Sequence, residues 1–235
     1  MARLQISLFF FGAFVLPVVA ADLNTDIFDF TKPMIESHLE IGRLRVELEK
    51  AKHHSERDQI LYTMQAKLWN HSPNRATSEQ EYREAKANAE ISKTTLSDLA
   101  AKIKEAEASK AFFEARSKGV HNPDQMQQLA LLHKAVWEAR LESAKVERQI
   151  AETTLEQRKW IFDMNDRLLQ SQSTSYYEWV LAKDKYDTAI TMEVASKFYI
   201  DEVQKALDLA SGLCGRADGE RRNSLERGSK ERSDR

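Results

Sequence analysis

Apolar residues recur at every third and fourth position through most of the chain after residue 33. The cleanest run extends from Tyr82 to Phe113 and keeps this spacing over four heptads. This is the period of coiled coils, in which each helix packs one apolar stripe against a neighbour. The pattern predicts helices over residues 33–69, 79–116, 123–170 and 176–212.

Short turns separate these segments, so consecutive helices are expected to run antiparallel. The predicted fold is all-α and elongated, with four long helices in up-down-up-down order that form two antiparallel coiled-coil hairpins. Packed and splayed arrangements of the two hairpins both satisfy the pattern.

The stripe is weaker in the first and fourth helices. The predicted contact positions of the first helix are Ile41, Leu44, Leu48, Ala51, Leu61, Met64 and Leu68. Residues 52–58, in the middle of this series, are polar on every face, which predicts a stutter or a wetter segment. In the fourth helix, Glu193 and Ser196 fall on the stripe and interrupt it.

The pattern Ser-x-x-Glu-aromatic-x-x-Ala-Lys begins at Ser78 and again at Ser175. Its first four residues form a capping box, in which the serine hydroxyl accepts a backbone hydrogen bond and the glutamate reaches back to the serine N–H. Each copy therefore predicts a helix that starts directly after a turn. Because the copies begin alternate helices, both are expected at the same end of the molecule. An internal duplication and two independent caps both account for the repeat.

Residues 1–21 have the pattern of a secretory signal peptide. One positive charge precedes an apolar run over residues 6–20, and small residues follow it. The run is short for a membrane span and contains Pro17, although an uncleaved signal anchor is the alternative. Residues 22–32 are then a connector, with Pro33 at the first helical position. The protein is expected to be periplasmic or secreted.

The C-terminal region differs in composition from the helices. Gly212 and Gly215 are expected to end the fourth helix. Residues 214–235 are highly charged and almost free of apolar side chains, which predicts a disordered tail. Cys214 is the only cysteine, so no intramolecular disulfide can form; a free thiol and an intermolecular bridge are the two readings.

The charge balance limits the class of partner. Charged residues make up 31% of the chain, and the formal net charge is −2 at pH 7. Both signs are interspersed, which argues against nucleic acid as a partner. The composition is typical of long solvated helices and allows a homo-oligomer. Since no second apolar stretch is long enough to cross a bilayer, membrane contact is expected only through partners.

No motif for catalysis or metal binding is evident. The chain has no nucleophile elbow and no glycine-rich phosphate loop. None of the six histidines follows a glutamate by three residues, as di-iron bundles require. Glu49 with His53, and His54 with Asp58, are one turn apart and are expected to be surface contacts. We expect a protein that is not an enzyme and holds no metal or cofactor.

The two turns and the helices after them resemble the periplasmic α-hairpins of HlyD-type membrane fusion proteins, and also the hairpins of TolC-type outer-membrane channels. Both turns carry Ser-x-x-Glu-aromatic-x-x-Ala. Leu168 and Ser175 stand at the spacing of the leucine and serine through which fusion proteins contact their channel. The arginine position of that motif is Met164, although Arg167 lies beside Leu168.

The resemblance covers the hairpins only. At the first turn Ser78 matches the serine, whereas His71 stands at the leucine position. No segment alternates like the strands of the β domains in fusion proteins or of the barrel in the channels. Tyr82 and Trp179 are expected to pack in the seam beside the turns.

The resemblance implies an exported, non-catalytic coiled-coil adaptor that contributes its hairpin tips to an envelope transport or secretion assembly of the efflux type. Its partner would be an outer-membrane channel or an inner-membrane transporter component. The alternatives are a periplasmic chaperone of the holdase type and a structural coiled-coil spacer. The predicted partner-binding residues at the tips are Leu168, Ser175, Ser78, Arg167, Tyr176 and Tyr177.

Overall fold

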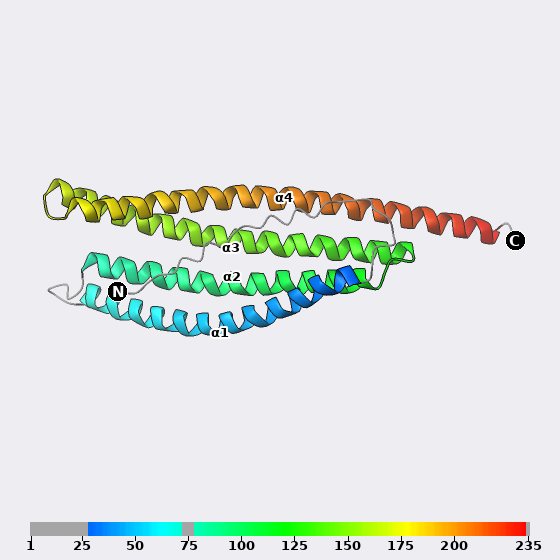
Figure 1. Cartoon of the computed structure of the whole chain (residues 1–235), viewed down its shortest axis with the longest axis horizontal. Coiled ribbons are helices and arrows are strands. Elements are labelled where there is room, and N and C mark those ends of the chain that lie inside the picture. The colour runs from blue at the N-terminus through cyan, green and yellow to red at the C-terminus, as the bar shows by residue number, and fades with distance from the viewer. Residues whose placement is uncertain (1–27, 72–77, 234–235) are drawn as a thin grey trace.

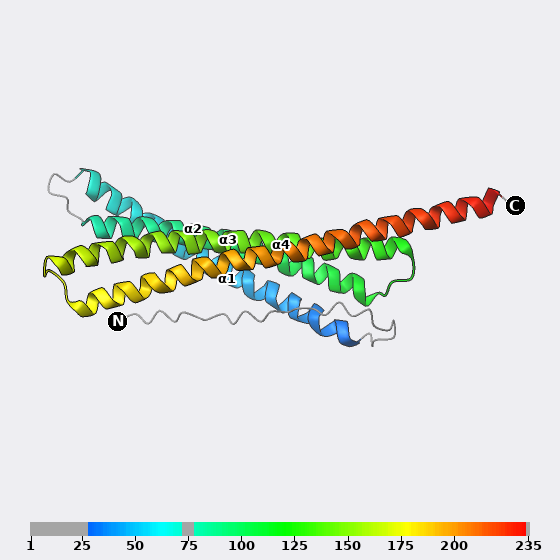
Figure 2. The ribbon, with the colours of Figure 1, turned by 90° about the horizontal axis from the view of Figure 1, so that it is seen from above.

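Four long helices lie side by side in one twisted row (Figures 1 and 2). A computed structural model of the chain describes residues 28–71 and 78–233. The helices are α1 (Phe28–His71), α2 (Glu79–Ser117), α3 (Pro123–Gln170) and α4 (Tyr176–Ser233). Within the described residues only consecutive helices contact each other, so α2 and α3 are central and α1 and α4 form the edges. The predicted all-α up-down-up-down fold is confirmed, and the two hairpins pack together through α2 and α3.

The first hairpin closes around a small apolar core. Its members are Ile41, Leu44, Leu48 and Ala51 of α1 and Leu99, Ile103 and Ala106 of α2. All of them occupy predicted stripe positions, because a spacing of three and four residues keeps one face of each helix toward the other.

In the second half of α1, the predicted contact positions are wrong. Leu61, Met64 and Leu68 are exposed, whereas Tyr62 and Trp69 pack against Tyr82 of α2. The heptad register of Ala51 continues without a stutter through positions that carry polar side chains. The continuing positions, which are all at least half-buried, are Ser55, Asp58, Tyr62, Gln65 and Trp69.

The stripe of α4 also extends further than predicted. Glu193 remains on it and pairs with Lys197 at 2.6 Å. The helix passes through both Gly212 and Gly215 and ends at Ser233, so the predicted helix end and disordered tail are wrong. Packing of the continuing stripe offsets the helix cost of the two glycines. The stripe positions, buried or half-buried throughout, are Trp179, Ala182, Tyr186, Ala189, Glu193, Ser196, Ile200, Val203, Leu207, Ala210, Cys214 and Ala217.

The central helices bury two faces rather than one. α2 turns Leu99 toward α1 and Phe112 toward α3, where its ring centroid lies 5.2 Å from that of His133. A hairpin needs one stripe per helix, so the single predicted seam accounts only for the α1 side. Buried Ala101 and Phe112 lie outside that seam because they serve the second contact.

The helix ends follow local signals in most places. α3 begins after Asn122, whose side chain accepts a 2.8 Å hydrogen bond from the Gln125 N–H. Gly119 ends the turn after α2 with φ 75°, a left-handed conformation that suits glycine. α1 begins at Phe28, so Pro33 lies inside the helix rather than at its first position. The predicted signal peptide, residues 1–21, lies outside the described residues.

Candidate interaction site at the hairpin tips

Both predicted capping boxes are present. The Ser78 hydroxyl accepts from the Glu81 N–H at 3.1 Å, and the Ser78 N–H donates to Glu81 Oε2 at 2.9 Å. At the second turn, the Ser175 hydroxyl accepts from the Glu178 N–H at 3.2 Å, and the Ser175 N–H donates to Glu178 Oε2 at 3.1 Å. Hydrogen bonds from the Thr174 hydroxyl and then from Ser175 lower the pKa of the Glu178 carboxyl. Both helix starts are therefore fixed by their own side chains.

The starts of α2 and α4 lie at the same end of the row, and the turn between α2 and α3 lies at the other end (Figures 1 and 2). We call the first of these ends, with residues 78–82 and 167–179, the tip end. The arrangement follows from the antiparallel order of the helices, and the predicted placement of the two serine turns is confirmed.

The turn between α3 and α4 closes with a Schellman motif. The Ser173 N–H donates to the Leu168 carbonyl at 2.8 Å, and the Gln172 N–H donates to the Leu169 carbonyl at 3.0 Å. Gln172 has φ 56° and is the residue in the left-handed conformation, where glycine is most common. This motif ends α3 sharply and leads the chain to the Ser175 cap.

The predicted tip residues of the second turn lie together, but with different exposure. Tyr176 and Tyr177 are 68% and 69% exposed. Ser175 and Arg167 are also exposed, whereas Leu168 is half-buried. Ser78 is exposed at the first turn of the tip end. The two tyrosines thus present exposed aromatic surface at this end that a partner protein can reach.

A layer of aromatic rings supports the second tip. Trp179 donates from Nε1 to Asp166 Oδ1 at 3.0 Å, and its ring centroid lies 5.9 Å from Phe162. Tyr176 stacks on the outer side of Trp179 at 5.6 Å, and Phe162 stacks on Tyr186 at 5.4 Å. The expected packing of Trp179 is confirmed. Phe162 and Asp166 are missing from the predicted site, although Asp166 lies only 13 residues before Trp179, on the other helix of the same hairpin.

Ion pairs join the two hairpins at mid-length. Lys102 of α2 lies 2.9 Å from Asp98 on its own helix and 2.8 Å from Glu147 on α3. Burial raises the pKa of the Asp98 carboxyl, and the hydrogen bond from Lys102 opposes this only in part. Burial acts to lower the pKa of Lys102, but its two carboxylate partners outweigh that effect and raise it. Lys102 is therefore held as a cation between two helices.

A second charged contact lies further along the same joint. Arg140 of α3 donates to Glu105 of α2 at 2.6 Å, and its guanidinium lies 4.9 Å from the centre of the Trp137 ring. Trp137 in turn donates from Nε1 to Nε2 of His133 at 3.2 Å. Burial, and secondarily the charge of Arg116, lowers the pKa of His133. The joint thus relies on polar side chains as well as on Phe112.

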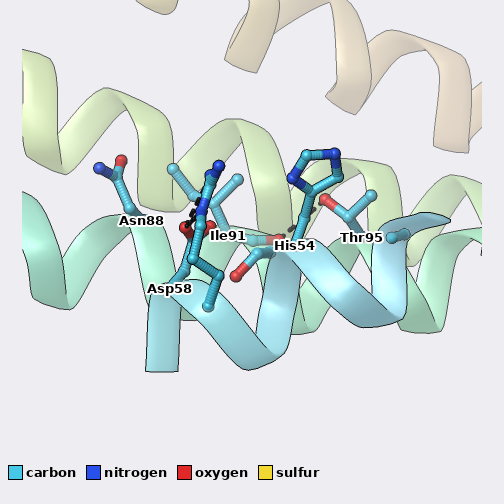
Figure 3. Close-up of a pocket in the computed structure, with 8 residues that line it drawn as sticks. His54, Asp58, Asn88, Ile91 and Thr95 are labelled. Carbon is cyan, nitrogen blue, oxygen red and sulfur yellow. Dashed lines mark hydrogen bonds and ion pairs between the residues drawn. The ribbon is translucent and has the colours of Figure 1, made fainter. Parts of the chain in front are cut away.

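A pocket of about 340 Å³ lies between α1 and α2, where the first hairpin seam becomes polar. Figure 3 shows His54 and Asp58 on α1 facing Asn88, Ile91 and Thr95 on α2. No group of three or more metal-binding side chains occurs in residues 28–71 and 78–233. The pocket agrees with a wetter segment at residues 52–58, and the hydroxyls of Ser92 and Thr95 in its lining donate to backbone carbonyls of their own helix.

Comparison with known proteins returns no matching family model, no matching curated protein and no matching solved structure. None of the described helices combines the length and the apolar character needed to cross a membrane.

Proposed function

We propose that this protein is a non-catalytic helical adaptor, which binds a protein partner through its tip end. The proposal places it in an envelope transport or secretion assembly, outside the cytoplasm, with an outer-membrane channel or an inner-membrane transporter component as partner. This setting rests on the signal-peptide pattern of residues 1–21 and on the hairpin resemblance, both of which remain predictions.

The observation that carries the proposal is the placement of both serine turns at one end of the row (Figure 1). The starts of α2 and α4 at one end can contribute to a composite surface, whereas helix starts at opposite ends could not. Tyr176 and Tyr177 are exposed there, and aromatic side chains are enriched in protein interfaces. The Tyr176 ring stacks on the Trp179 ring, which restricts its motion, so part of this surface is ordered before a partner binds.

The test is capture of the partner by crosslinking in cells, with a photoreactive group in place of Tyr177. We expect one envelope membrane protein as the main product. The double variant Tyr176→Ser, Tyr177→Ser is then expected to abolish binding to that protein, with only a small fall in melting temperature from loss of the Tyr176–Trp179 stack. A matched control is Ile35→Ser, Leu39→Ser, which removes two exposed apolar side chains from the opposite end of α1.

Variants of Ser175 distinguish a role in helix capping from a role in contact with the partner. Ser175→Ala is expected to cost about 1 kcal/mol of stability through loss of the cap. Ser175→Asn keeps a capping oxygen and adds no charge beside Glu178, so it retains stability and loses binding only if the hydroxyl itself touches the partner. Unchanged binding in the double tyrosine variant, together with lost binding in the Ile35 and Leu39 control, would overturn the assignment of the tip end.

A holdase is the second candidate, and a specific observation favours it. The edge helices expose apolar side chains along their outer faces, including Leu39, Ile60 and Met64 on α1. Such rows can hold unfolded chains. This function predicts that the crosslinked products are many unrelated proteins and that the chain suppresses aggregation of a denatured enzyme.

A further inference from the structure

The outer edge of α4 carries exposed side chains that the fold leaves uncovered. Among the described residues α4 contacts only α3, and this row lies on the opposite side of the helix. Phe198 and Leu209 are 67% and 74% exposed. We call the following residues the outer row of α4: Val194, Phe198, Glu202, Lys205, Leu209 and Leu213.

The outer row has apolar and charged positions in the same order in both directions, and its two charges are of opposite sign. Two apolar residues stand at each end, and an acid and a base stand between them. A second copy that runs antiparallel, with a two-fold axis beside Val203, places Phe198 against Leu209 and Glu202 against Lys205. The same register places Val194 against Leu213. Each charge then meets its opposite, and each apolar side chain meets another.

We propose that the outer row of α4 is the interface of a homodimer, in which two copies of α4 pack antiparallel about this axis. A two-fold interface must be complementary to itself, as this row is. Glu202 and Lys205 already lie 2.7 Å apart within one copy, so four charges alternate around the axis in the dimer. The axis lies close to the middle of α4, which lets the two helices overlap along most of their length.

Glu202 and Lys205 favour an antiparallel pair of α4 helices over a parallel pair. A parallel pair in register would place Glu202 against Glu202 and Lys205 against Lys205. Like charges at facing positions destabilise helix pairs, whereas opposite charges set orientation and register. The outer face of α1 is the competing surface, and its exposed Met64 supplies the control.

Sedimentation equilibrium of the full chain tests the association. We expect a monomer–dimer equilibrium in which Phe198→Glu raises the dissociation constant more than about tenfold. Met64→Glu is expected to leave it unchanged. A wild-type chain that remains monomeric at about 100 μM, or an equal effect of Met64→Glu, would overturn the proposal.

A charge exchange tests the register without removing apolar surface. Glu202→Lys and Lys205→Glu are each expected to weaken the dimer, because each creates like-charge contacts across the axis. The double variant restores opposite charges and is expected to recover the wild-type dissociation constant within about threefold. A double variant as weak as the single variants would exclude this register.

Disulfide trapping tests the direction. In a Cys214→Ser background, a mixture of Phe198→Cys and Leu209→Cys chains is expected to form a mixed disulfide. Phe198→Cys alone is not, since its two thiols would be about 16 Å apart along an antiparallel pair. A disulfide between two Phe198→Cys chains, without a mixed disulfide, would show a parallel pair. Tip-end binding is independent of these variants, so failure here leaves the proposed adaptor function to its own test.

Discussion

The hydroxyls of Ser78 and Ser175 are already committed to local hydrogen bonds. Each accepts from the N–H of the glutamate three residues later and donates its proton to that glutamate, at 3.0 Å for Ser78 and 3.2 Å for Ser175. A hydroxyl has one proton and two lone pairs, so one lone pair remains. A partner that contacts either serine must therefore supply a donor, such as a backbone N–H or an arginine.

Gln172 is the one described non-glycine residue with positive φ, at 56°. Glycine relieves the contact between Cβ and the backbone that this conformation imposes on other residues. Gln172→Gly is expected to raise the free energy of unfolding by about 1 kcal/mol, measured by urea denaturation. Ser171 has φ −85°, so Ser171→Gly is the matched control and is expected to destabilise. Stabilisation by both variants would contradict the strain argument.

His133 makes stability depend on pH. Its lowered pKa means that the unfolded chain binds a proton first, near the ordinary value of about 6.5. Stability is therefore fully present above that pH and falls as the pH drops toward the folded pKa. His133→Gln, whose carbonyl can still accept from Trp137, is expected to lose less stability between pH 7.5 and pH 5.5 than the wild type. If urea titrations show that the wild type and His133→Gln lose the same stability between pH 7.5 and pH 5.5, this role is contradicted.

Residue-level features were predictable where the signal is short. The two capping boxes need only four consecutive residues, so Ser78 with Glu81 and Ser175 with Glu178 were found from the sequence. Gln172 was not, because glutamine carries no preference for the left-handed region and the motif depends on the path of the turn.

At the scale of the element, the joint between α2 and α3 contains a half-buried cation, Lys102. Lys102→Ala removes the partner of both Asp98 and Glu147 and leaves the buried Asp98 carboxylate unpaired. Breaking such a pair is costly, although the partly exposed Lys102 reduces the effect. We expect a loss of about 2 kcal/mol in urea denaturation.

Lys104 provides the control for this variant. It lies on the same helix and is exposed, so Lys104→Ala is expected to change stability by less than about 0.5 kcal/mol. A similar loss in both variants would indicate that helix propensity, rather than the ion pairs, sets the result.

Element bounds were predictable where a cap and a stripe agree, as at the starts of α2 and α3. They were missed where the two disagree. Gly212 and Gly215 predicted a helix end, but α4 continues through them to Ser233, and Ala210 and Ala217 continue the buried stripe. In α1, Leu61 and Leu68 were assigned to the predicted seam because they are apolar. The residues that keep the register are instead Tyr62 and Trp69.

For the whole molecule, the second contact face of α2 and α3 is what joins two hairpins into a row. A sequence pattern with one stripe per helix predicts the hairpins but not their joint. Half-buried charged groups such as Lys102 and Arg140 form part of that joint, and composition alone cannot distinguish them from solvated surface.

The proposed dimer would also change how the tip ends are presented. Tyr176 lies about 27 residues from the proposed axis, so the two tip ends would be about 80 Å apart and face in opposite directions. An adaptor of this form would have two binding ends and would connect two partner molecules rather than one.

In the part of the chain that the structure describes, each helix contacts only its neighbours in sequence, so no contact between α1 and α4 has to form for these four helices to pack. A chain that emerges gradually, from a ribosome or from a translocation channel, could pack each new helix against the preceding helix, which has already emerged. Assembly would then proceed in the order of synthesis, and an incomplete chain would not have to wait for its last helix before protecting its first.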